Sequence, residues 1–183
     1  MKIQTKRLLL RKATLSDKKE IFAYRSDKKT NQYQAWIPEN LKDVSEFIGK
    51  IANTYNRPDS WFQFVIIENS SGKLVGDLGV HFLEKGSQQA EIGCTLSKNF
   101  HGKGYANEAL TAIMDSLFLD IEIHRIFASI DPKNIASIKM MEKLGFRKEA
   151  HFKESLFLNG KWVDDVVFAI LNKEWLVKKE KNA

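Results

Sequence analysis

Short apolar blocks bounded by polar turns occur along much of the chain and predict β-strands. Lys6–Lys12 (KRLLLRK) predicts the first of them. Three later blocks are separated only by the turns at 68–72 and 84–88, so they predict an antiparallel meander. A further strand and a hairpin around Asn159-Gly160 are predicted nearer the C-terminus. The later strands are Trp61–Ile67, Lys73–Phe82, Ala90–Leu96, Arg125–Ile130, Phe146–Leu158 and Lys161–Leu171.

Helical spacing of apolar residues marks four other segments. In the clearest of them, residues 106, 109, 110, 113, 114 and 117 form one apolar stripe. Ser16-Asp17 could cap an early helix, and Asn134 could cap a late one that ends at Gly145. A polar tail is expected after Trp175. The predicted helices are Ser16–Ser26, Asp43–Asn56, Ala106–Leu117 and Asn134–Leu144.

The order of these elements predicts the fold class. A meander followed by two strand–helix crossovers and a closing hairpin is typical of an α/β sandwich with a mixed sheet. The crossover makes Ala90–Leu96 and Arg125–Ile130 parallel neighbours. No repeat or linker interrupts the pattern, so we expect a single domain over residues 1–183. Its sheet should be mostly antiparallel and twisted, with about seven strands and with helices on both faces.

Composition excludes several classes of protein. Of the 183 residues, 43% are hydrophobic and 11% aromatic, which argues against disorder. No apolar run approaches the ~18 residues that span a bilayer, and no signal peptide is evident, so we expect a cytoplasmic protein without a membrane partner. The single cysteine, Cys94, excludes an internal disulfide, and no metal site is expected. The net charge of +6 is scattered, which suits a phosphorylated cofactor better than a nucleic acid.

The segment 99–108 (NFHGKGYANE) carries the most informative chemistry. A strand ends near Leu96, a short loop contains Gly102 and Gly104, and an amphipathic helix follows at once. Unpaired amides and the partial positive charge of a helix N-terminus bind phosphate, and glycines let the anion approach closely. The P-loop motif is absent, and the dinucleotide motif fails because its sixth position is Asn107.

The loop 101–106 (HGKGYA) resembles the [Q/R]-x-x-G-x-[G/A] pyrophosphate loop of the GNAT acetyltransferases. The longer run FHGKGYANEAL is similar to the branch related to ribosomal-protein N-acetyltransferases, the RimJ/RimL type. The resemblance implies a GNAT-like fold and transfer of an acetyl group from acetyl-CoA to a primary amine, without a metal. Further matches are Thr5–Arg11 (TKRLLLR), Ala90–Gly93 (AEIG), Asn134-x-x-Ser137, Glu142–Phe146 (EKLGF), and Asn159-Gly160 followed by Asp164.

The resemblance also implies which residues hold acetyl-CoA. They lie at the end of the fourth main strand, in the loop, and at the start of the late helix. Cys94 is interpreted as a core residue there and not as a nucleophile, because no partnered histidine is evident. The implied cofactor-binding residues are Cys94, Thr95, Leu96, His101, Gly102, Lys103, Gly104, Tyr105, Ala106, Asn134 and Ser137.

Three positions depart from the family pattern. His101 replaces Gln or Arg, which should be tolerated because backbone amides do most of the phosphate binding. Met141 stands where many GNAT enzymes have a tyrosine that protonates the leaving thiolate, and Ser137 is the branch's alternative for this catalytic role. Leu156 occupies the position of a glutamate used in some of the branch, so the general base cannot be carried over.

The attacking amine must be neutral, and this requirement guides the search for a base. An α-amine has a pKa of only about 7.7–8.0, against about 10.4 for a lysine side chain, so an N-terminal acceptor makes less demand on a base. Glu91 is the first candidate base, acting through water, although a salt-bridged strand carboxylate is an equal alternative. His81 is interpreted more readily as packing. Trp36 and Asp164 are predicted to bind the acceptor, or else to be structural.

Other interpretations stay open at this stage. The same fold could serve as a non-catalytic acyl-CoA-binding or interaction module, or the net charge could indicate a protein that binds RNA or the ribosome. The acceptor could be a protein N-terminus, including that of a ribosomal protein, or a small amine. Backbone amides beside Gly93–Leu96 could stabilise the oxyanion. The C-terminal hairpin could mediate a homodimer.

Overall fold

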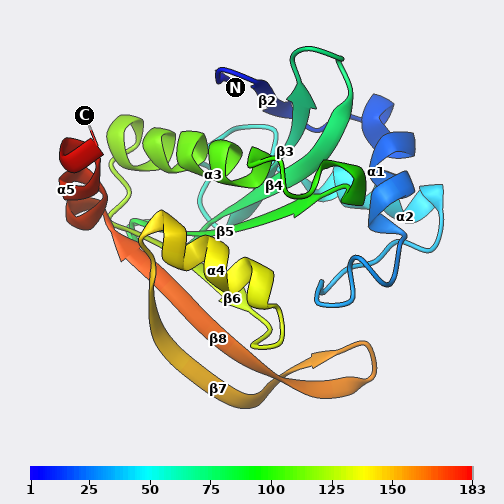
Figure 1. The fold of residues 1–183 in the computed structure, drawn as a ribbon. Coiled ribbons are helices and arrows are strands. Elements are labelled where there is room, and N and C mark those ends of the chain that lie inside the picture. Colours follow the sequence, from blue (N-terminus) through cyan, green and yellow to red (C-terminus); the bar gives the residue numbers. More distant parts are fainter. Residues whose placement is uncertain (183) are drawn as a thin grey trace.

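Eight strands of the computed structural model form one sheet in the order β1-β2-β3-β4-β5-β6-β8-β7, and the structure describes residues 1–182 (Figure 1). The strands β3, β4 and β5 form the predicted antiparallel meander, and β5 and β6 are parallel neighbours, as the crossover required. The strands are β1 Lys2–Gln4, β2 Leu8–Lys12, β3 Ser60–Glu68, β4 Leu74–Phe82, β5 Gln89–Leu96, β6 Arg125–Ile130, β7 Arg147–Leu158 and β8 Lys161–Leu171.

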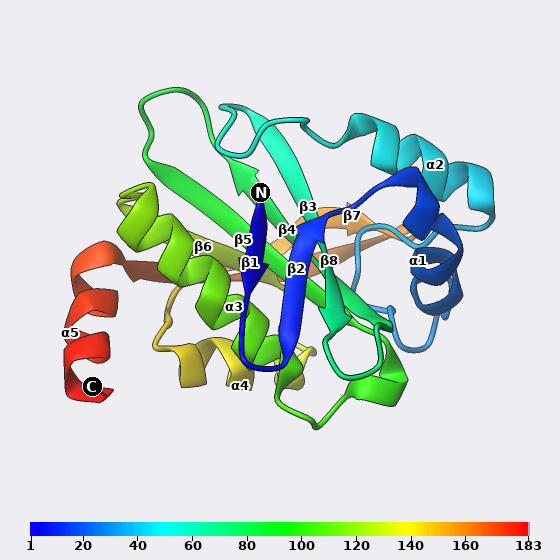
Figure 2. The same ribbon diagram turned by 90° about the horizontal axis from the view of Figure 1, so that it is seen from above.

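The helices cover both faces of the sheet, as predicted (Figure 2). We call the face under α1 and α2 the α1 face, and the opposite face, under α3, α4 and α5, the α3 face. The helices are α1 Lys18–Arg25, α2 Leu41–Lys50, α3 Tyr105–Asp115, α4 Ile135–Leu144 and α5 Asn172–Asn182, with short helical turns η1 Leu15–Asp17, η2 Lys98–Phe100 and η3 Ser116–Asp120.

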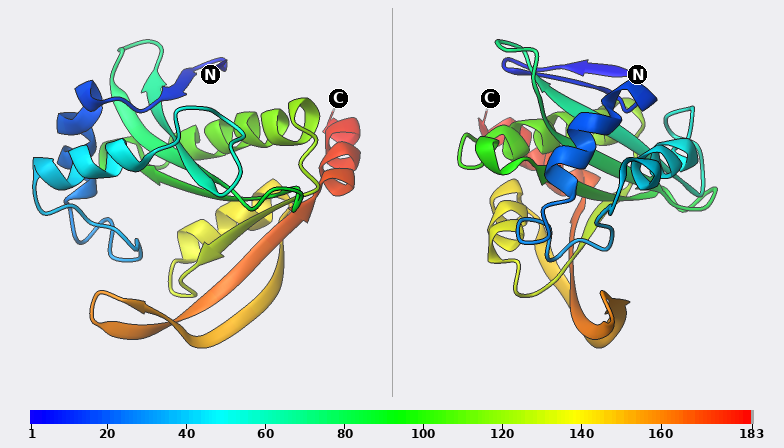
Figure 3. Two further views of the ribbon diagram at one scale, coloured as in Figure 1. Left: turned by 180° about the vertical axis from the view of Figure 1, so that it is seen from behind. Right: turned by 90° about the vertical axis from the view of Figure 1, so that its right-hand side faces the viewer.

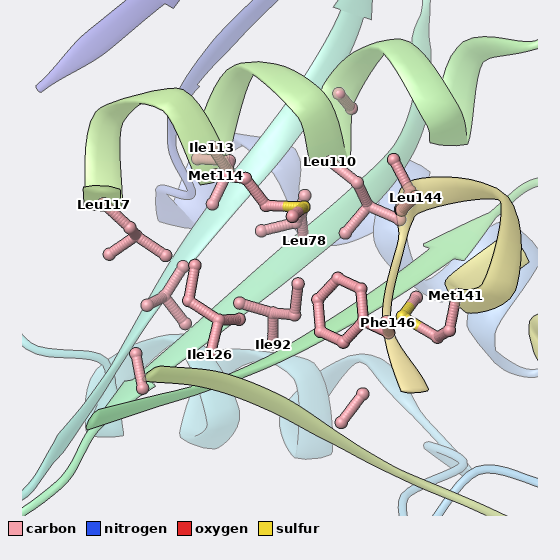
Figure 4. Close-up of a cluster of buried hydrophobic side chains, with 14 of the residues drawn as sticks. Leu78, Ile92, Leu110, Ile113, Met114, Leu117, Ile126, Met141, Leu144 and Phe146 are labelled. Atoms are coloured by element: carbon pink, nitrogen blue, oxygen red, sulfur yellow. The ribbon is translucent and has the colours of Figure 1, made fainter. Parts of the chain in front are cut away.

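The main hydrophobic core lies between the sheet and the helices of the α3 face. Leu110, Ile113 and Met114 project from α3 onto Leu78 and Ile92 of the central strands (Figure 4). These α3 residues belong to the apolar stripe that the sequence placed on one helix face. A smaller cluster fills the α1 face and includes Ile21, Val44, Ile48 and Val65. Successive residues of a strand point to opposite faces, so the two cores show which side chains lie on the α1 face and which on the α3 face.

Two features of the sheet and of the second helix differ from the sequence prediction. The sheet has eight strands instead of about seven, because the short strand β1 pairs with β2 around a single apolar residue, Ile3, which gives too weak a pattern to detect. The second helix ends at Lys50 instead of Asn56. There Ile51 adopts an extended backbone, and the amide of Ala52 donates to the carbonyl of Trp61 at 2.8 Å, so pairing with β3 replaces the helix.

The C-terminal segment is helical, so the expectation of a polar tail after Trp175 was wrong. Helix α5 begins at Asn172 and is held by the buried indole of Trp175, which packs near Phe118 and donates to Asp115 Oδ1 at 2.9 Å. The adjacent Leu176 and Val177 are exposed. One buried aromatic residue therefore anchors this helix. Its sequence has no apolar stripe, so the helical pattern could not be detected from the sequence.

Candidate active site

The strands β5 and β6 pair over three residues only and then separate. Their ladder ends at the pair Glu91 and Phe127. Beyond it an opening of about 590 Å³ lies between the ends of the two strands and extends to the beginnings of α3 and α4. In Figure 3 the part of the sheet with β6, β8 and β7 bends away from the part with β3, β4 and β5. The parallel strands β5 and β6 therefore form a wedge between their C-terminal ends.

The loop before α3 has the geometry of an anion cradle. Gly102 and Gly104 have φ of 75° and 79°, in the left-handed region that glycine tolerates best. The first amide of α3 that bonds back along the helix is that of Glu108, which donates to the Gly104 carbonyl at 3.1 Å. The preceding amides, at 105–107, therefore point out of the helix end, and no side chain caps them. This arrangement fits a pyrophosphate.

The N-terminal strands hold this loop in place, through contacts that the sequence analysis did not foresee. Arg7 donates through Nη1 to the Lys103 carbonyl at 2.9 Å, and its Nε pairs with Glu108 Oε2 at 2.6 Å. The same guanidinium lies 4.7 Å from the ring centroid of Tyr105, whose hydroxyl donates to Glu68. The motif TKRLLLR, which marked the family resemblance, thus supports the glycine loop through Arg7.

His101 holds the loop on the side that faces β5. Its Nε2 lies 3.0 Å from the carbonyl oxygen of Leu96, at the end of β5. The Ser97 amide donates to the Val75 carbonyl at 2.9 Å, so the peptide groups of residues 97, 95 and 93 face β4. Those of Cys94 and Leu96 then face the wedge, where their N–H groups can meet a carbonyl oxygen. The histidine therefore links the loop to β5, and its tolerance in place of Gln or Arg stays a prediction.

The beginning of α4 forms the other wall of the opening. Asn134 caps the helix, accepting from the Ser137 amide at 3.2 Å, and both residues line the opening. Among the described residues, none forms a hydrogen bond with the Ser137 hydroxyl. Met141 is buried in the main core and also lines the opening, so this position carries no proton donor. Ser137 is therefore the hydroxyl that α4 presents to the opening, and its role as a proton donor stays a prediction.

The side chain of Cys94 confirms its interpretation as a core residue. It is packed against the main core from the α3 face, and it lines the opening together with Thr95 and Leu96. Burial raises the pKa of the Cys94 thiol to about 12, so the thiolate form that a nucleophile needs is scarce at neutral pH.

Glu91 lies on the α1 face of β5, next to residues that line the opening. Its Oε2 is 3.7 Å from Nδ1 of His81, which stacks on Trp61 with ring centroids 4.8 Å apart. Burial raises the pKa of the Glu91 carboxyl above its ordinary value, and the attraction of His81 only partly offsets this. A carboxylate in such a site holds a proton more readily than usual, as a general base requires. Its role as the base stays a prediction.

The two predicted acceptor residues lie outside the opening. Trp36 stacks on Phe47 with centroids 4.4 Å apart. Asp164 accepts hydrogen bonds from His151, Lys153 and the Glu154 amide on the hairpin, which hold its pKa well below the usual range. Both residues therefore make the structural contacts that were the alternative to acceptor binding.

The neighbouring Asp165 has the closer connection to the site. It is buried and accepts from Ser129 Oγ at 2.7 Å and from the Ile130 amide at 3.1 Å. Ser129 lines the opening on β6. The sequence could have signalled this choice, because residues 164 and 165 lie on opposite faces of a strand and only one of them can face the wedge.

A buried charge pair fixes the segment 30–34, which lines the opening on the α1 face. Arg25 donates to both carboxylate oxygens of Asp77, and Tyr24 and Gln63 donate to the same carboxylate. Asn31, also buried, donates to the Tyr24 carbonyl at 2.7 Å. Thr30, Tyr33 and Gln34 then line the opening beside Asn31. The network therefore positions the loop 30–34 at the opening.

Neither a metal centre nor a membrane span occurs in the part of the chain that the structure describes. Within residues 1–182, no three His, Cys, Asp or Glu side chains are grouped so that they could bind a metal ion. The described helices are too short and too polar to cross a bilayer.

Comparisons with known proteins agree with this geometry. The family described as acetyltransferase (GNAT) domain matches residues 7–147. The chain is 35% identical over 178 residues to the uncharacterized N-acetyltransferase YnaD of Bacillus subtilis (strain 168), covering 96% of this chain and 99% of that protein. It is also 31% identical over 124 residues to the ribosomal protein uS5-alanine N-acetyltransferase of Escherichia coli (strain K12), covering 67% of this chain and 64% of that protein.

A solved structure extends the agreement to the whole fold. The acetyltransferase (GNAT family) from Bacillus anthracis superposes with a TM-score of 0.84 at 31% identity, covering 94% of this chain and 99% of that one. With the glycine loop, the open wedge and the matching family, the resemblance seen in the sequence is confirmed. The chain belongs to the GNAT acetyltransferases, and it is an acetyl-CoA-dependent N-acetyltransferase that acts on a primary amine.

Proposed function

We propose that this enzyme acetylates the α-amine of a polypeptide N-terminus, which reaches the wedge from the α1 face. The observation that carries the proposal is the lining of the opening on that face: Thr30, Asn31, Tyr33 and Gln34 are all uncharged. A polyamine carries further positive charges, and binding it favourably would call for carboxylates at this wall. Neutral hydrogen-bonding side chains suit a peptide backbone better.

The names of the relatives include two classes of acceptor. The uS5-alanine N-acetyltransferase acts, by its name, on an alanine of a ribosomal protein, whereas another relative, 23% identical, is a spermidine N(1)-acetyltransferase of Vibrio cholerae. The uncharged wall formed by Thr30, Asn31, Tyr33 and Gln34 favours the former class for this chain. A ribosomal protein is therefore one acceptor to test, and a cytoplasmic location stays a prediction from the sequence.

The proposed chemistry uses four groups of this chain. Acetyl-CoA supplies the acetyl group as a thioester, so that a nitrogen–carbon bond forms, the carbon–sulfur bond breaks, and CoA leaves as the thiol. The amides at 105–107 would hold the pyrophosphate. The N–H groups of Cys94 and Leu96 would stabilise the negative charge that develops on the carbonyl oxygen. Glu91 would take the amine proton through water and then release it to solvent, and Ser137 would donate its proton to sulfur and regain one from solvent, so that both groups end as they began.

Acceptor discrimination tests the proposal directly. Purified enzyme and acetyl-CoA are incubated with a tetrapeptide bearing a free N-terminus, with the same peptide blocked at its N-terminus but containing lysine, and with spermidine. Thiol release and mass spectrometry identify the product. We expect acetylation of the free α-amine at a rate at least about tenfold above the other two, because that amine has the lower pKa. Acetylation of spermidine alone would overturn the N-terminal assignment and leave the acetyltransferase itself intact.

The hairpin of β7 and β8 bears on the oligomeric state. Phe152, Phe157 and Trp162 are each more than half exposed there. A homodimer through this hairpin stays a prediction from the sequence, and sedimentation of the purified chain would test it.

A further inference from the structure

Two glycines face each other across β4 and β5 on the α1 face, and they differ in the space around them. Gly79 and Gly93 are register partners. A Cβ at Gly79 would come within 2.8 Å of Gln63 Oε1 and 3.1 Å of the Trp61 ring, so its missing side chain makes room for these two residues. A Cβ at Gly93 would meet nothing within 4 Å. Only Gly93 therefore leaves open space on this face.

That open space lies at the entrance to the wedge. Gly93 follows the last paired residue of β5, Glu91, by two positions on the same face, about 7 Å along the strand. If the ladder continued, Gly93 would face Ser129 of β6, and both residues line the opening. The Ser129 hydroxyl is fixed by Asp165 at 2.7 Å. The bare backbone of residue 93 and the fixed side chain of Ser129 thus form the two sides of the entrance.

We propose that Gly93 determines acceptor specificity, by setting how bulky the carbon atom next to the attacking amine can be. The proposal rests on the proposed arrival of the amine from the α1 face, because that amine passes residue 93 before it reaches the wedge. The carbon beside an α-amine carries both a carbonyl group and a side chain, so it is wider than the CH₂ of a linear alkylamine. With glycine at 93 the entrance admits this branched carbon. A side chain at 93 would narrow it.

Gly93 also offers a substitution that separates sterics from folding. Its backbone is extended and its φ lies outside the positive region, so alanine fits without strain. Alanine also favours a strand more than glycine does. Gly49, on the exposed side of α2 with nothing within 4 Å of a Cβ, provides the matched glycine-to-alanine control far from the opening. Neither change alters a side chain that is proposed to bind acetyl-CoA or to move a proton.

The test uses binding, so that it does not depend on turnover. The probes are conjugates in which an acetyl linker joins the sulfur of CoA to the N-terminal nitrogen of a tripeptide. The tripeptide begins with glycine in one conjugate and with valine in the other, and calorimetry gives the affinity of each. For Gly93→Ala we expect a loss of about 10- to 100-fold for the valine conjugate and less than about threefold for the glycine conjugate, since small steric differences in a pocket discriminate by such factors. Acetyl-CoA alone should bind as in the wild type, and Gly49→Ala should change nothing.

Other results would overturn the proposal. Equal losses for both conjugates, or a matching loss for acetyl-CoA alone, would show that residue 93 affects the cofactor and not the acceptor carbon. Unchanged affinities in Gly93→Ala would show that the entrance lies elsewhere. Failure of the N-terminal assignment has a different signature, since both peptide conjugates would then bind the wild type no better than acetyl-CoA. In that case conjugates of an unbranched and an α-branched alkylamine repeat the same comparison.

Discussion

Gly104 is the position at which one substitution can test the cofactor site with the least ambiguity. It precedes α3 with φ 79° and ψ 5°, directly before the amides that are proposed to hold the pyrophosphate. Asn and Asp tolerate this left-handed conformation better than other side chains, and they differ from each other mainly in charge. Gly104→Asp and Gly104→Asn therefore form a matched pair in which conformation and volume are nearly constant.

The magnitude of the charge effect follows from Coulomb's law. A carboxylate at residue 104 would stand about 5 Å from a phosphate held by the neighbouring amides, which at an effective dielectric constant of about 20 gives about 3 kcal/mol of repulsion. This corresponds to about a 200-fold loss of affinity for acetyl-CoA relative to Gly104→Asn. A Cβ at this position comes no closer than 3.4 Å to Arg7 Nη2, so the asparagine variant should lose less than about tenfold.

Calorimetric titration with acetyl-CoA at low and high salt measures both effects. Added salt screens an exposed charge, so the difference between the two variants should shrink as the ionic strength rises. Thermal unfolding of both variants controls for folding. If Gly104→Asp binds within threefold of Gly104→Asn, the pyrophosphate does not lie at this helix end, and the assignment of the loop is wrong.

Three further predictions address the base, the buried charge and the last helix. Glu91→Gln should lower kcat about 100-fold without changing acetyl-CoA affinity, and it should remove the acid limb of the wild-type pH profile. That limb rises with pH through a pKa above the ordinary glutamate value, because burial raises the pKa of Glu91 and only the ionised carboxylate accepts a proton; an unchanged profile would exclude Glu91. Arg25→Met should lower the free energy of unfolding in urea by about 3–5 kcal/mol, because it leaves the buried Asp77 unpaired, whereas Lys42→Met in an exposed pair should change it by less than about 1 kcal/mol. Trp175→Ala should cost about 3–5 kcal/mol in the same measurement, and the exposed Val177→Ala less than about 0.5 kcal/mol; equal effects would contradict the anchoring role of Trp175.

Local physical chemistry made much of this protein predictable from its sequence. Asn134 and Gly145 bound α4 because helix ends need a side-chain acceptor at one end and a left-handed residue at the other. The glycine loop before α3 was recognisable because Gly102 and Gly104 leave bare backbone at a helix N-terminus, which is the geometry that suits phosphate. The crossover rule placed β5 beside β6. Each of these inferences depends on residues that are close in sequence, or on a topological constraint.

Only the tertiary structure decided the features that depend on distant partners. Arg7 supports a loop that follows it by almost a hundred residues, and nothing near Arg7 in the sequence indicates this contact. Trp36 and Asp164 had suitable chemistry for an acceptor site, but their stacking and hydrogen bonds lie outside the opening, while Asp165 lies behind it. The separation of β5 from β6 after Glu91 is set by how the two parts of the sheet bend. The sequence alone therefore determined the family, the glycine loop before α3, the meander and the pairing of β5 with β6, because these follow from local patterns and from the crossover rule. The shape of the acceptor entrance required the fold, because packing between remote segments sets it.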